Sequence, residues 1–365
     1  MNSMEIFFYQ AGCGDAARIR YLGNDGKYHN IMIDSGYSRT YSEILTEQLN
    51  EIERKKECID VWIISHIHDD HIEGAVAYIN SVKRGERKDI VDTWFYNAPR
   101  QPKHKNSKGR DNLISTPASI DNGDKLAEYL NSIGKLNTTD MTTESPNINL
   151  YGLSLIVLSP DSHKLRRLRE KYPPGSGNRL QRIEDEMTSL VSAARGHDYH
   201  KPLEAFALDQ WIEDDSVENG SSIAFLINYN DKNVLWLADA HPSLIVESLI
   251  KLGYNRKNKL TCEWVKVTHH GSKGNNSNKL YDIVNCSNYL ISANGTNRHC
   301  LPTKECLARI LRNENRPMET EYKLYFTYDD TILRRIFDVD STIVFKKYNF
   351  HTLYLNGQKY LKTTL

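Results

Sequence analysis

Runs of apolar residues divide the chain into predicted strands and helices. Residues 61–64 and 264–267 are short, β-branched apolar runs of the kind that forms buried strands. Apolar residues spaced three or four apart predict an amphipathic helix over residues 41–55, and another helix is expected over 72–79. Further strands are expected at residues 5–10, 17–22, 30–34, 90–97, 153–158 and 289–291, a hairpin at 218–225 and 234–240, and helices at 122–133, 165–171, 180–194 and 303–312. The chain is therefore expected to combine β-sheet with helices.

The strand predicted at residues 61–64 ends in a cluster of polar side chains. Three histidines and two aspartates follow it within six residues, namely His66, His68, Asp69, Asp70 and His71. Neutral imidazole and carboxylate are the ligands that zinc and similar cations prefer. Because alternate residues of an extended segment point the same way, His66 and His68 can bind one ion, with Asp70 and His71 facing a second. A surface loop that is merely rich in histidine and acid is the alternative, and the HxHxDH spacing disfavours it.

HxHxDH at the end of a buried strand resembles the signature of the metallo-β-lactamase superfamily. The resemblance implies an α+β, four-layer αββα sandwich with a two-metal site along one edge of its paired sheets. It implies that Asp34, at the end of strand 30–34, supports the metal ligands from behind. It also implies that Asp239, at the end of the returning hairpin strand, bridges both metals. Ala238 stands where the superfamily usually has glycine.

Three further motifs resemble the soluble β-lactamase-like domain of competence DNA-uptake proteins and its stand-alone relatives. They are Gly12-Cys13-Gly14-Asp15-Ala16, Ile33-Asp34-Ser35-Gly36 and His269-His270-Gly271-Ser272. This resemblance favours phosphodiesters as substrates. Two histidines and a serine at a glycine turn supply donors for a phosphoryl oxygen, or an acid for the leaving group. One of His269 and His270 is therefore expected to face the substrate, while Asp70 is expected to bind metal and anchor the attacking hydroxide.

The first metal site departs from the superfamily pattern. Many members place a histidine just before the outgoing strand of the hairpin, where this chain has Glu218-Asn219. The protein ligands expected for the first metal are therefore only His66, His68 and Asp239. Asn219 is then expected to hydrogen-bond a substrate oxygen.

The last metal histidine of the superfamily follows a strand that corresponds here to residues 289–291. His299 lies three residues before Pro302, as in stand-alone relatives, and is the expected ligand. Competence-type proteins often place theirs immediately before the proline, where this chain has Leu301. The neighbouring Cys300 is a less favoured ligand.

Net charge gives no global attraction for nucleic acid, because 47 Lys and Arg residues balance 47 Asp and Glu residues. Any such attraction must be local. Two basic segments, residues 103–110 and 164–171, are candidates to line a substrate groove. The plainer interpretation of both segments is a solvated surface.

Cysteine usage and the chain start bear on the compartment. Six cysteines without a CxxC pair indicate reduced thiols in a cytosol-like compartment. The first residues lack the basic and apolar regions of a signal peptide. No apolar run approaches the roughly 18 residues that a membrane helix needs. The chain is therefore expected to be soluble, cytoplasmic and independent of membranes.

One large domain, residues 1–312, is expected to carry the site, with a helical insertion at residues 160–215. Residues 313–365 are rich in Tyr, Phe, Ile and Thr and are not covered by the resemblance. They are expected to form a small β-rich C-terminal appendage. This appendage is a candidate surface for a homo-oligomer or a partner protein.

The expected function is that of a hydrolase that uses a metal-bound hydroxide. A phosphodiesterase or nuclease that acts on nucleic acid or a nucleotide is favoured. One or two zinc ions, or alternatively manganese, are the expected cofactors. Two alternatives are a hydrolase of a small ester, thioester or lactone, and a catalytically weak, metal-bearing regulatory module.

Overall fold

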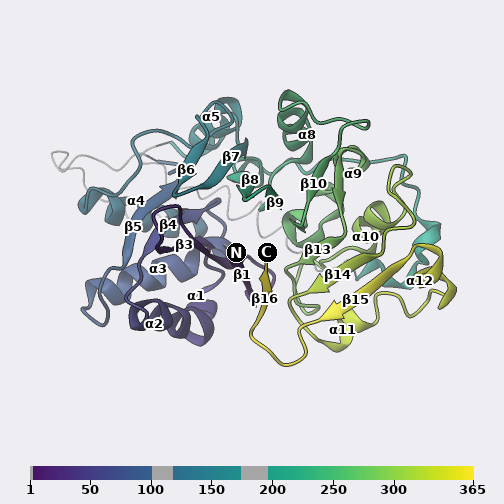
Figure 1. Cartoon of the computed structure of the whole chain (residues 1–365), viewed down its shortest axis with the longest axis horizontal. Coiled ribbons are helices and arrows are strands. Elements are labelled where there is room, and N and C mark those ends of the chain that lie inside the picture. The colour runs from purple at the N-terminus through teal and green to yellow at the C-terminus, as the bar shows by residue number, and fades with distance from the viewer. Residues whose placement is uncertain (1–2, 101–117, 174–195) are drawn as a thin grey trace.

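Two β-sheets face each other in the computed structural model, which describes residues 3–100, 118–173 and 196–365 (Figure 1). The strands of the first sheet are β1 (Met4–Tyr9), β2 (Ala16–Leu22), β3 (Tyr28–Asp34), β4 (Ile59–Ile64), β5 (Val91–Tyr96) and β16 (Tyr360–Thr364), in the order β16-β1-β2-β3-β4-β5. The basic loop at 103–110 and the helix expected at 180–194 lie outside the described residues.

The second sheet is larger and is assembled mostly from the second half of the chain. Its strands are β6 (Ile148–Leu150), β7 (Leu153–Ser159), β8 (Ala224–Tyr229), β9 (Lys232–Trp236), β11 (Trp264–Lys266), β13 (Asn288–Ile291), β14 (Tyr322–Phe326) and β15 (Phe350–Tyr354). They lie in the order β15-β14-β13-β11-β9-β8-β7-β6. A separate pair, β10 (Leu260–Cys262) and β12 (Val284–Cys286), lies beside it.

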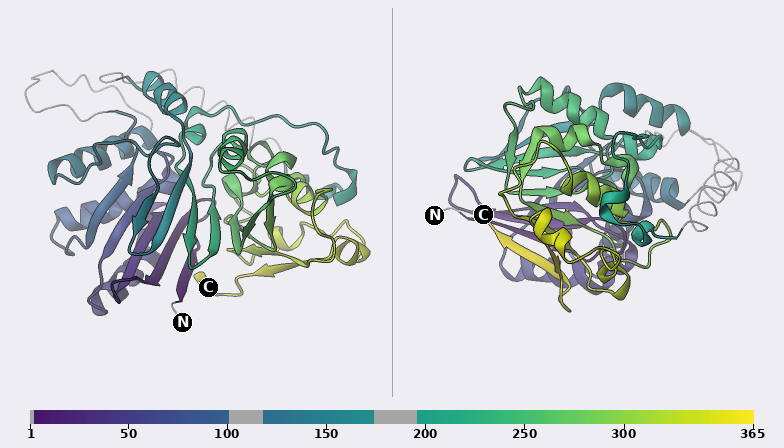
Figure 2. Two further views of the ribbon diagram at one scale, coloured as in Figure 1. Left: turned by 45° about the horizontal axis from the view of Figure 1, so that its top comes forward. Right: turned by 90° about the vertical axis from the view of Figure 1, so that its right-hand side faces the viewer.

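Alternating side chains give each sheet two apolar faces. In β1, Ile6 and Phe8 join the core between the sheets together with Trp236, whereas Phe7 and Tyr9 join the core beneath the helices. Helices α2 (Thr46–Arg54), α3 (Asp69–Lys83) and α4 (Ala118–Ser132) cover the first sheet, and α8 (Pro242–Lys251), α9 (Asn278–Ile283) and α10 (Lys304–Leu311) cover the second. The expected αββα sandwich is therefore confirmed (Figure 2).

Parallel pairing brings the polar strand ends together. Strands β3, β4 and β5 are parallel to one another in the first sheet, and β9, β11, β13 and β14 are parallel in the second. The carboxyl ends of parallel neighbours meet at the same edge of a sheet. The polar motifs that follow these strands therefore lie together at one edge of the sandwich.

The C-terminal segment contributes strands to both sheets. β14 and β15 extend the second sheet, whereas β16 pairs antiparallel with β1 of the first. The two ends of the chain consequently lie side by side, with Met4 and Leu365 exchanging two backbone hydrogen bonds (Figures 1 and 2). Each of β15 and β16 forms an edge of its sheet, so this segment covers strands that would otherwise be exposed for pairing.

The described part of the segment expected as an insertion packs on both halves of the sandwich. Helix α5 (Ser162–Lys171) places Leu165 and Leu168 in the core outside the first sheet. Two short turns, Asp198–His200 and Leu203–Ala205, pack against the second sheet. Among the described residues, no helix is both long and apolar enough to cross a membrane.

Candidate metal centre

The HxHxDH motif lies where β4 ends and α3 begins. β4 ends at Ile64, and α3 begins at Asp69 after the extended residue His68. His66 Nε2 and His68 Nδ1 are 3.0 Å apart. Together with Asp239 they form a group whose candidate ligand atoms all lie within 4.8 Å of one another. The turn after the buried strand thus brings the two imidazoles close together.

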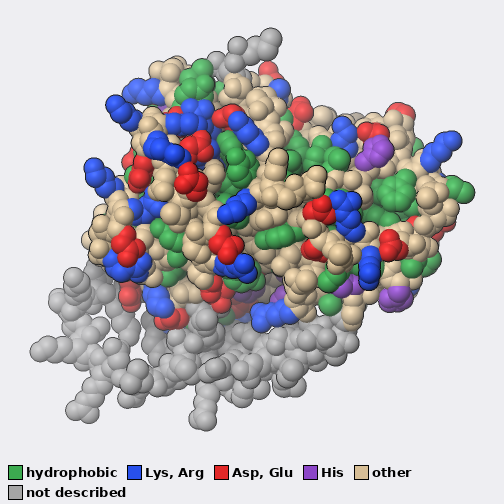
Figure 3. All heavy atoms as spheres, turned by 90° about the horizontal axis from the view of Figure 1, so that it is seen from below, with side chains coloured by type: hydrophobic (Ala, Val, Ile, Leu, Met, Phe, Trp, Pro, Cys, Tyr) green, Lys and Arg blue, Asp and Glu red, His purple; other side chains and the backbone are tan. Residues whose placement is uncertain are grey.

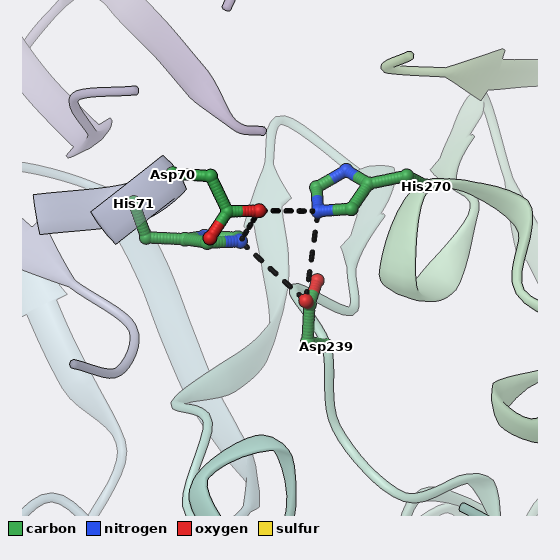
Figure 4. Close-up of side chains that lie close together, drawn as sticks. All are labelled: Asp70, His71, Asp239 and His270. Carbon is green, nitrogen blue, oxygen red and sulfur yellow. Dashed lines mark ion pairs between the residues drawn. The ribbon is translucent and has the colours of Figure 1, made fainter. Parts of the chain in front are cut away.

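A second group contains Asp70, His71, Asp239 and His270, again with candidate ligand atoms within 4.8 Å of one another. Asp239 Oδ2 lies 3.5 Å from Nε2 of both His71 and His270. Asp70 Oδ2 lies 3.7 Å from His71 Nε2 and 3.3 Å from His270 Nε2. The four side chains converge from α3 and from two loops of the second sheet (Figure 4). Asp239 belongs to both groups, which is the geometry of a bridging carboxylate.

Several atoms of these groups are chemically suited to a metal. His71 Nε2 and His270 Nε2 are buried without a hydrogen-bond partner among the described residues. A buried polar atom without a partner costs roughly 1–3 kcal/mol, so such atoms are rare unless a ligand satisfies them. Imidazole nitrogen and carboxylate oxygen are the donor set that zinc prefers. The residues therefore fit one or two divalent cations.

Asp34 supports the centre from behind. Its carboxylate accepts hydrogen bonds from the backbone and hydroxyl of Ser65, at 2.7 and 2.9 Å, and lies 2.9 Å from His71 Nδ1. A proton on His71 Nδ1 is thereby directed to Asp34, which leaves the Nε2 lone pair facing Asp70 and Asp239. Outer carboxylates that fix a ligating histidine in this way are typical of metal sites.

Comparison with known proteins agrees with the architecture. A sequence model of the metallo-beta-lactamase superfamily matches residues 23–92, the segment that carries HxHxDH. The fold is that of a metallo-β-lactamase. No curated protein matches this chain.

Two solved structures illustrate how distant the similarity is. The metallo-beta-lactamase IND-7 aligns with 14% identity and a TM-score of 0.20, over 43% of this chain and 55% of that protein. A long form RNase Z from yeast aligns with 14% identity and a TM-score of 0.38, over 80% of this chain and 37% of that protein. The chain thus spans about half of the first protein and little more than a third of the second.

The HHGS turn has a backbone conformation that was not predicted from the sequence. Residues Thr268–Gly271 form a tight turn in which His269 and His270 both have left-handed backbone angles, φ 46° and 53°. The turn sends His270 into the second group, and His270 Nδ1 lies 2.9 Å from Ser292 O. The sequence predicts that one of these histidines acts on the substrate, and His270 is not among the metal ligands that it predicts.

His269 lies beside the centre and is open to solvent. Its side chain is 24% exposed, and its Nε2 is 3.6 Å from Asp239 Oδ2. On the other side of the ring, Nδ1 is 2.7 Å from Asn275 Oδ1 and 3.8 Å from Asp214 Oδ2. Contacts at Nδ1 therefore fix the orientation of the His269 ring, and its Nε2 faces Asp239. Asn275 and Asp214 have no signal in the sequence, because they reach His269 only through the fold.

His299 belongs to neither ligand group within the described part of the chain. It lies at the surface next to Arg298, whose Nε donates to His299 Nε2 at 3.0 Å. Desolvation of the ring and the Arg298 guanidinium lower the pKa of His299 to about 4. Charges of Asp70 and His270 also act on it, so it lies at the rim of the centre. The structure thus brings His270, and not His299, into the second group.

Asn219 lies in the short helix α7 (Val217–Gly220) and is buried. Its Nδ2 donates to Asp214 Oδ2 at 2.7 Å, so its orientation is fixed. Its Oδ1 has no hydrogen-bond partner among the described residues. The adjacent Glu218 accepts hydrogen bonds from Tyr172 and Lys171, and it does not belong to the first group. The Oδ1 atom of Asn219 is therefore held in a fixed orientation and is free to accept a hydrogen bond.

The charges of the groups alter each other's pKa values. Burial by itself lowers the pKa of His71 and His270, but Asp239 and its neighbours raise both pKa values well above the ordinary value. Burial raises the pKa of Asp239, yet the imidazoles, led by His270, lower it well below the ordinary value. Burial and the rings of His71 and His68 lower the pKa of His66. Cation binding here would displace protons from His71 and His270.

Proposed function

We propose that this chain is a metal-dependent hydrolase of phosphodiester bonds, with nucleic acid or a nucleotide as substrate. The observation that carries the proposal is the position of Asp239 Oδ2. It lies 3.9, 3.5, 3.6 and 3.5 Å from Nε2 of His66, His71, His269 and His270 respectively. Asp239 is common to both ligand groups and would help to hold a cation in each of them. Zinc suits the imidazole-rich set, and manganese is the alternative.

When bound there, divalent cations lower the pKa of a coordinated water towards neutral and polarise the phosphoryl group. The chain supplies proton transfer, which we assign to His269. Asn275 orients its Nδ1, and Asp214 stabilises the ring when it is protonated. His269 Nε2 then donates its proton to the leaving oxygen. Asn219 Oδ1 is available to accept a hydrogen bond from a hydroxyl or amino group of a nucleotide substrate, because the phosphodiester itself has no donor.

Two features favour a phosphodiester over a carbonyl substrate. The GCGDA, IDSG and HHGS motifs are similar to those of competence-type proteins. Arg298 is exposed at the rim of the centre, and guanidinium groups bind phosphate oxygens in a bidentate manner. Positive and negative side chains are interspersed over the face shown in Figure 3, so attraction for a phosphate must come from local groups such as Arg298.

The test is a comparison of substrates with protein stripped by chelator and then reloaded with Zn²⁺ or Mn²⁺. Turnover of bis(p-nitrophenyl) phosphate and not of p-nitrophenyl acetate is expected, and Asp70→Ala should abolish it. Preference for the acetate would favour the small-ester alternative. Stoichiometric metal with turnover of neither compound would favour a metal-bearing regulatory module.

A further inference from the structure

A buried ion pair lies directly behind the candidate metal centre. Lys266, the last residue of β11, and Asp15, from the Gly-Cys-Gly-Asp turn before β2, form this pair, and both side chains have 0% exposure. They join the two sheets, since β2 and β11 lie in different ones. A lysine inside the apolar run of residues 264–267 is unusual, because lysine is rarely fully buried unless it is paired. Neither residue takes part in the proton transfer assigned above.

Lys266 lies near Asp239 on the side away from the histidines. Its Nζ donates to Ala238 O at 3.2 Å and lies 3.9 Å from Asp239 Oδ1. Asp239 Oδ2 is the oxygen that faces the histidines. One carboxylate therefore has a fixed cation at one oxygen and the candidate metal positions at the other.

Asp15 contacts the ligands of the second group. Its Oδ1 is 3.5 Å from His270 Nδ1, and its backbone N–H donates to Asp70 O at 3.1 Å. The neighbouring Gly14 is required for this approach, because a Cβ on it would lie 2.3 Å from Asp70 O. The GCGD turn is thus packed against the backbone of one ligand and the ring of another.

We infer that Lys266 and Asp15 are positioning residues that orient Asp239 and His270 towards the metals. The charge of Lys266 reduces the repulsion between the carboxylates of Asp15 and Asp239. Its attraction for Oδ1 of Asp239 also orients that side chain, so that Oδ2 is directed at the imidazoles. Asp15 in turn restrains the ring of His270. This inference rests on the metal centre proposed above.

A purely electrostatic effect predicts little change in metal affinity. The charge of Lys266 repels a cation at the centre and that of Asp15 attracts it, so the loss of both charges together leaves the net charge unchanged. A purely structural ion pair can be replaced by apolar residues of similar volume with little change. A marked loss of metal affinity therefore separates positioning from both of these explanations.

The experiment removes both charges at once, because a single substitution would leave one buried charge without its partner. The variant is Asp15→Leu with Lys266→Met, and the more conservative Asp15→Asn with Lys266→Gln is the second variant in case the first does not fold. Lys304→Met with Asp340→Leu is the matched control, because Lys304 and Asp340 form another buried ion pair, with 0% and 3% exposure, that contacts neither ligand group. Folding is monitored by circular dichroism, and Zn²⁺ affinity by competition with a chelating dye.

Removal of the Asp15–Lys266 pair is expected to weaken Zn²⁺ binding by roughly 10- to 100-fold, as for other residues that orient metal ligands. The Co²⁺ absorption spectrum should change as well, and the control should match the wild-type protein. Unchanged or tighter binding, or equal weakening in the control, would overturn the inference. Failure of the wild-type protein to bind metal would overturn the proposed centre itself, and is thereby distinguished from failure of this inference.

Discussion

His270 Nε2 lies 3.3 Å from Asp70 Oδ2, and this contact joins the two halves of the sandwich at the candidate metal centre. Asp70 is held by the N-terminus of α3, beside the first sheet, and His270 by a turn after β11 of the second. Neither half contains the complete second group. Metal binding is therefore expected to couple the two halves.

Replacement of His270 tests its assignment as a ligand. His270→Ala removes an imidazole from the second group, so we expect a loss of about one metal ion per chain. His299→Ala is the matched variant, because His299 lies at the rim with its Nε2 bonded to Arg298. Metal content, measured by mass spectrometry after dialysis, should be unchanged in His299→Ala. Metal loss in His299→Ala with retention in His270→Ala would reverse the assignment.

Replacement of His269 separates proton transfer from metal binding. In His269→Ala the turnover number for a phosphodiester should fall by about 10²- to 10⁴-fold, the usual cost of losing a positioned acid. Metal content should stay at the wild-type level. Asn275→Asp is a useful companion, because Asn275 contacts His269 Nδ1 and its change should alter the pH profile of the reaction. Loss of metal in His269→Ala would instead identify His269 as a ligand of the first metal.

Arg298 is predicted to contribute to substrate binding. Arg298→Ala removes an exposed guanidinium at the rim, so the KM for a phosphodiester should rise by about tenfold with little change in kcat. Arg84→Ala is the control, since Arg84 is 59% exposed and paired with Glu86. A KM that is the same in both variants and the wild-type protein would exclude Arg298 from the binding site.

His29 is predicted to make stability depend on pH. Burial lowers its pKa, but hydrogen bonds with Asp60 and Asp25, at 2.7 and 3.0 Å, raise the pKa above the ordinary value overall. A raised pKa stabilises the folded state fully below the unfolded value of about 6.5, and this contribution is lost as pH rises through the folded value. His29→Gln should therefore reduce the free energy of unfolding more at acidic than at alkaline pH.

Urea unfolding at about pH 5.5 and about pH 9, on either side of the ordinary histidine pKa, measures this difference. The exposed His200→Gln serves as the control and should leave stability nearly unchanged at both values. A destabilisation by His29→Gln that is equal at the two pH values would mean that the charge of His29 does not contribute.

Features that depend on local order along the chain could be predicted from the amino-acid sequence alone. Strands and helices follow from the periodicity of apolar side chains, so β4 and α3 lie close to the segments that were predicted from this periodicity. The positions of His66, His68, Asp70 and His71 relative to one another follow from the same strand end, since only a few residues separate them. The αββα sandwich followed from the family resemblance of this motif.

The distant residues that complete the site could be identified only in the folded structure, because no local pattern relates them. His269 and His270 have left-handed backbone angles in a turn where Gly271 packs against Pro302, and the sequence did not show which of the two histidines faces the centre. The partnership of Lys266 with Asp15 joins segments far apart in the chain, and no local pattern encodes it. The pairing of β16 with β1 is of the same kind, because long-range contacts are selected by the packing of whole sheets.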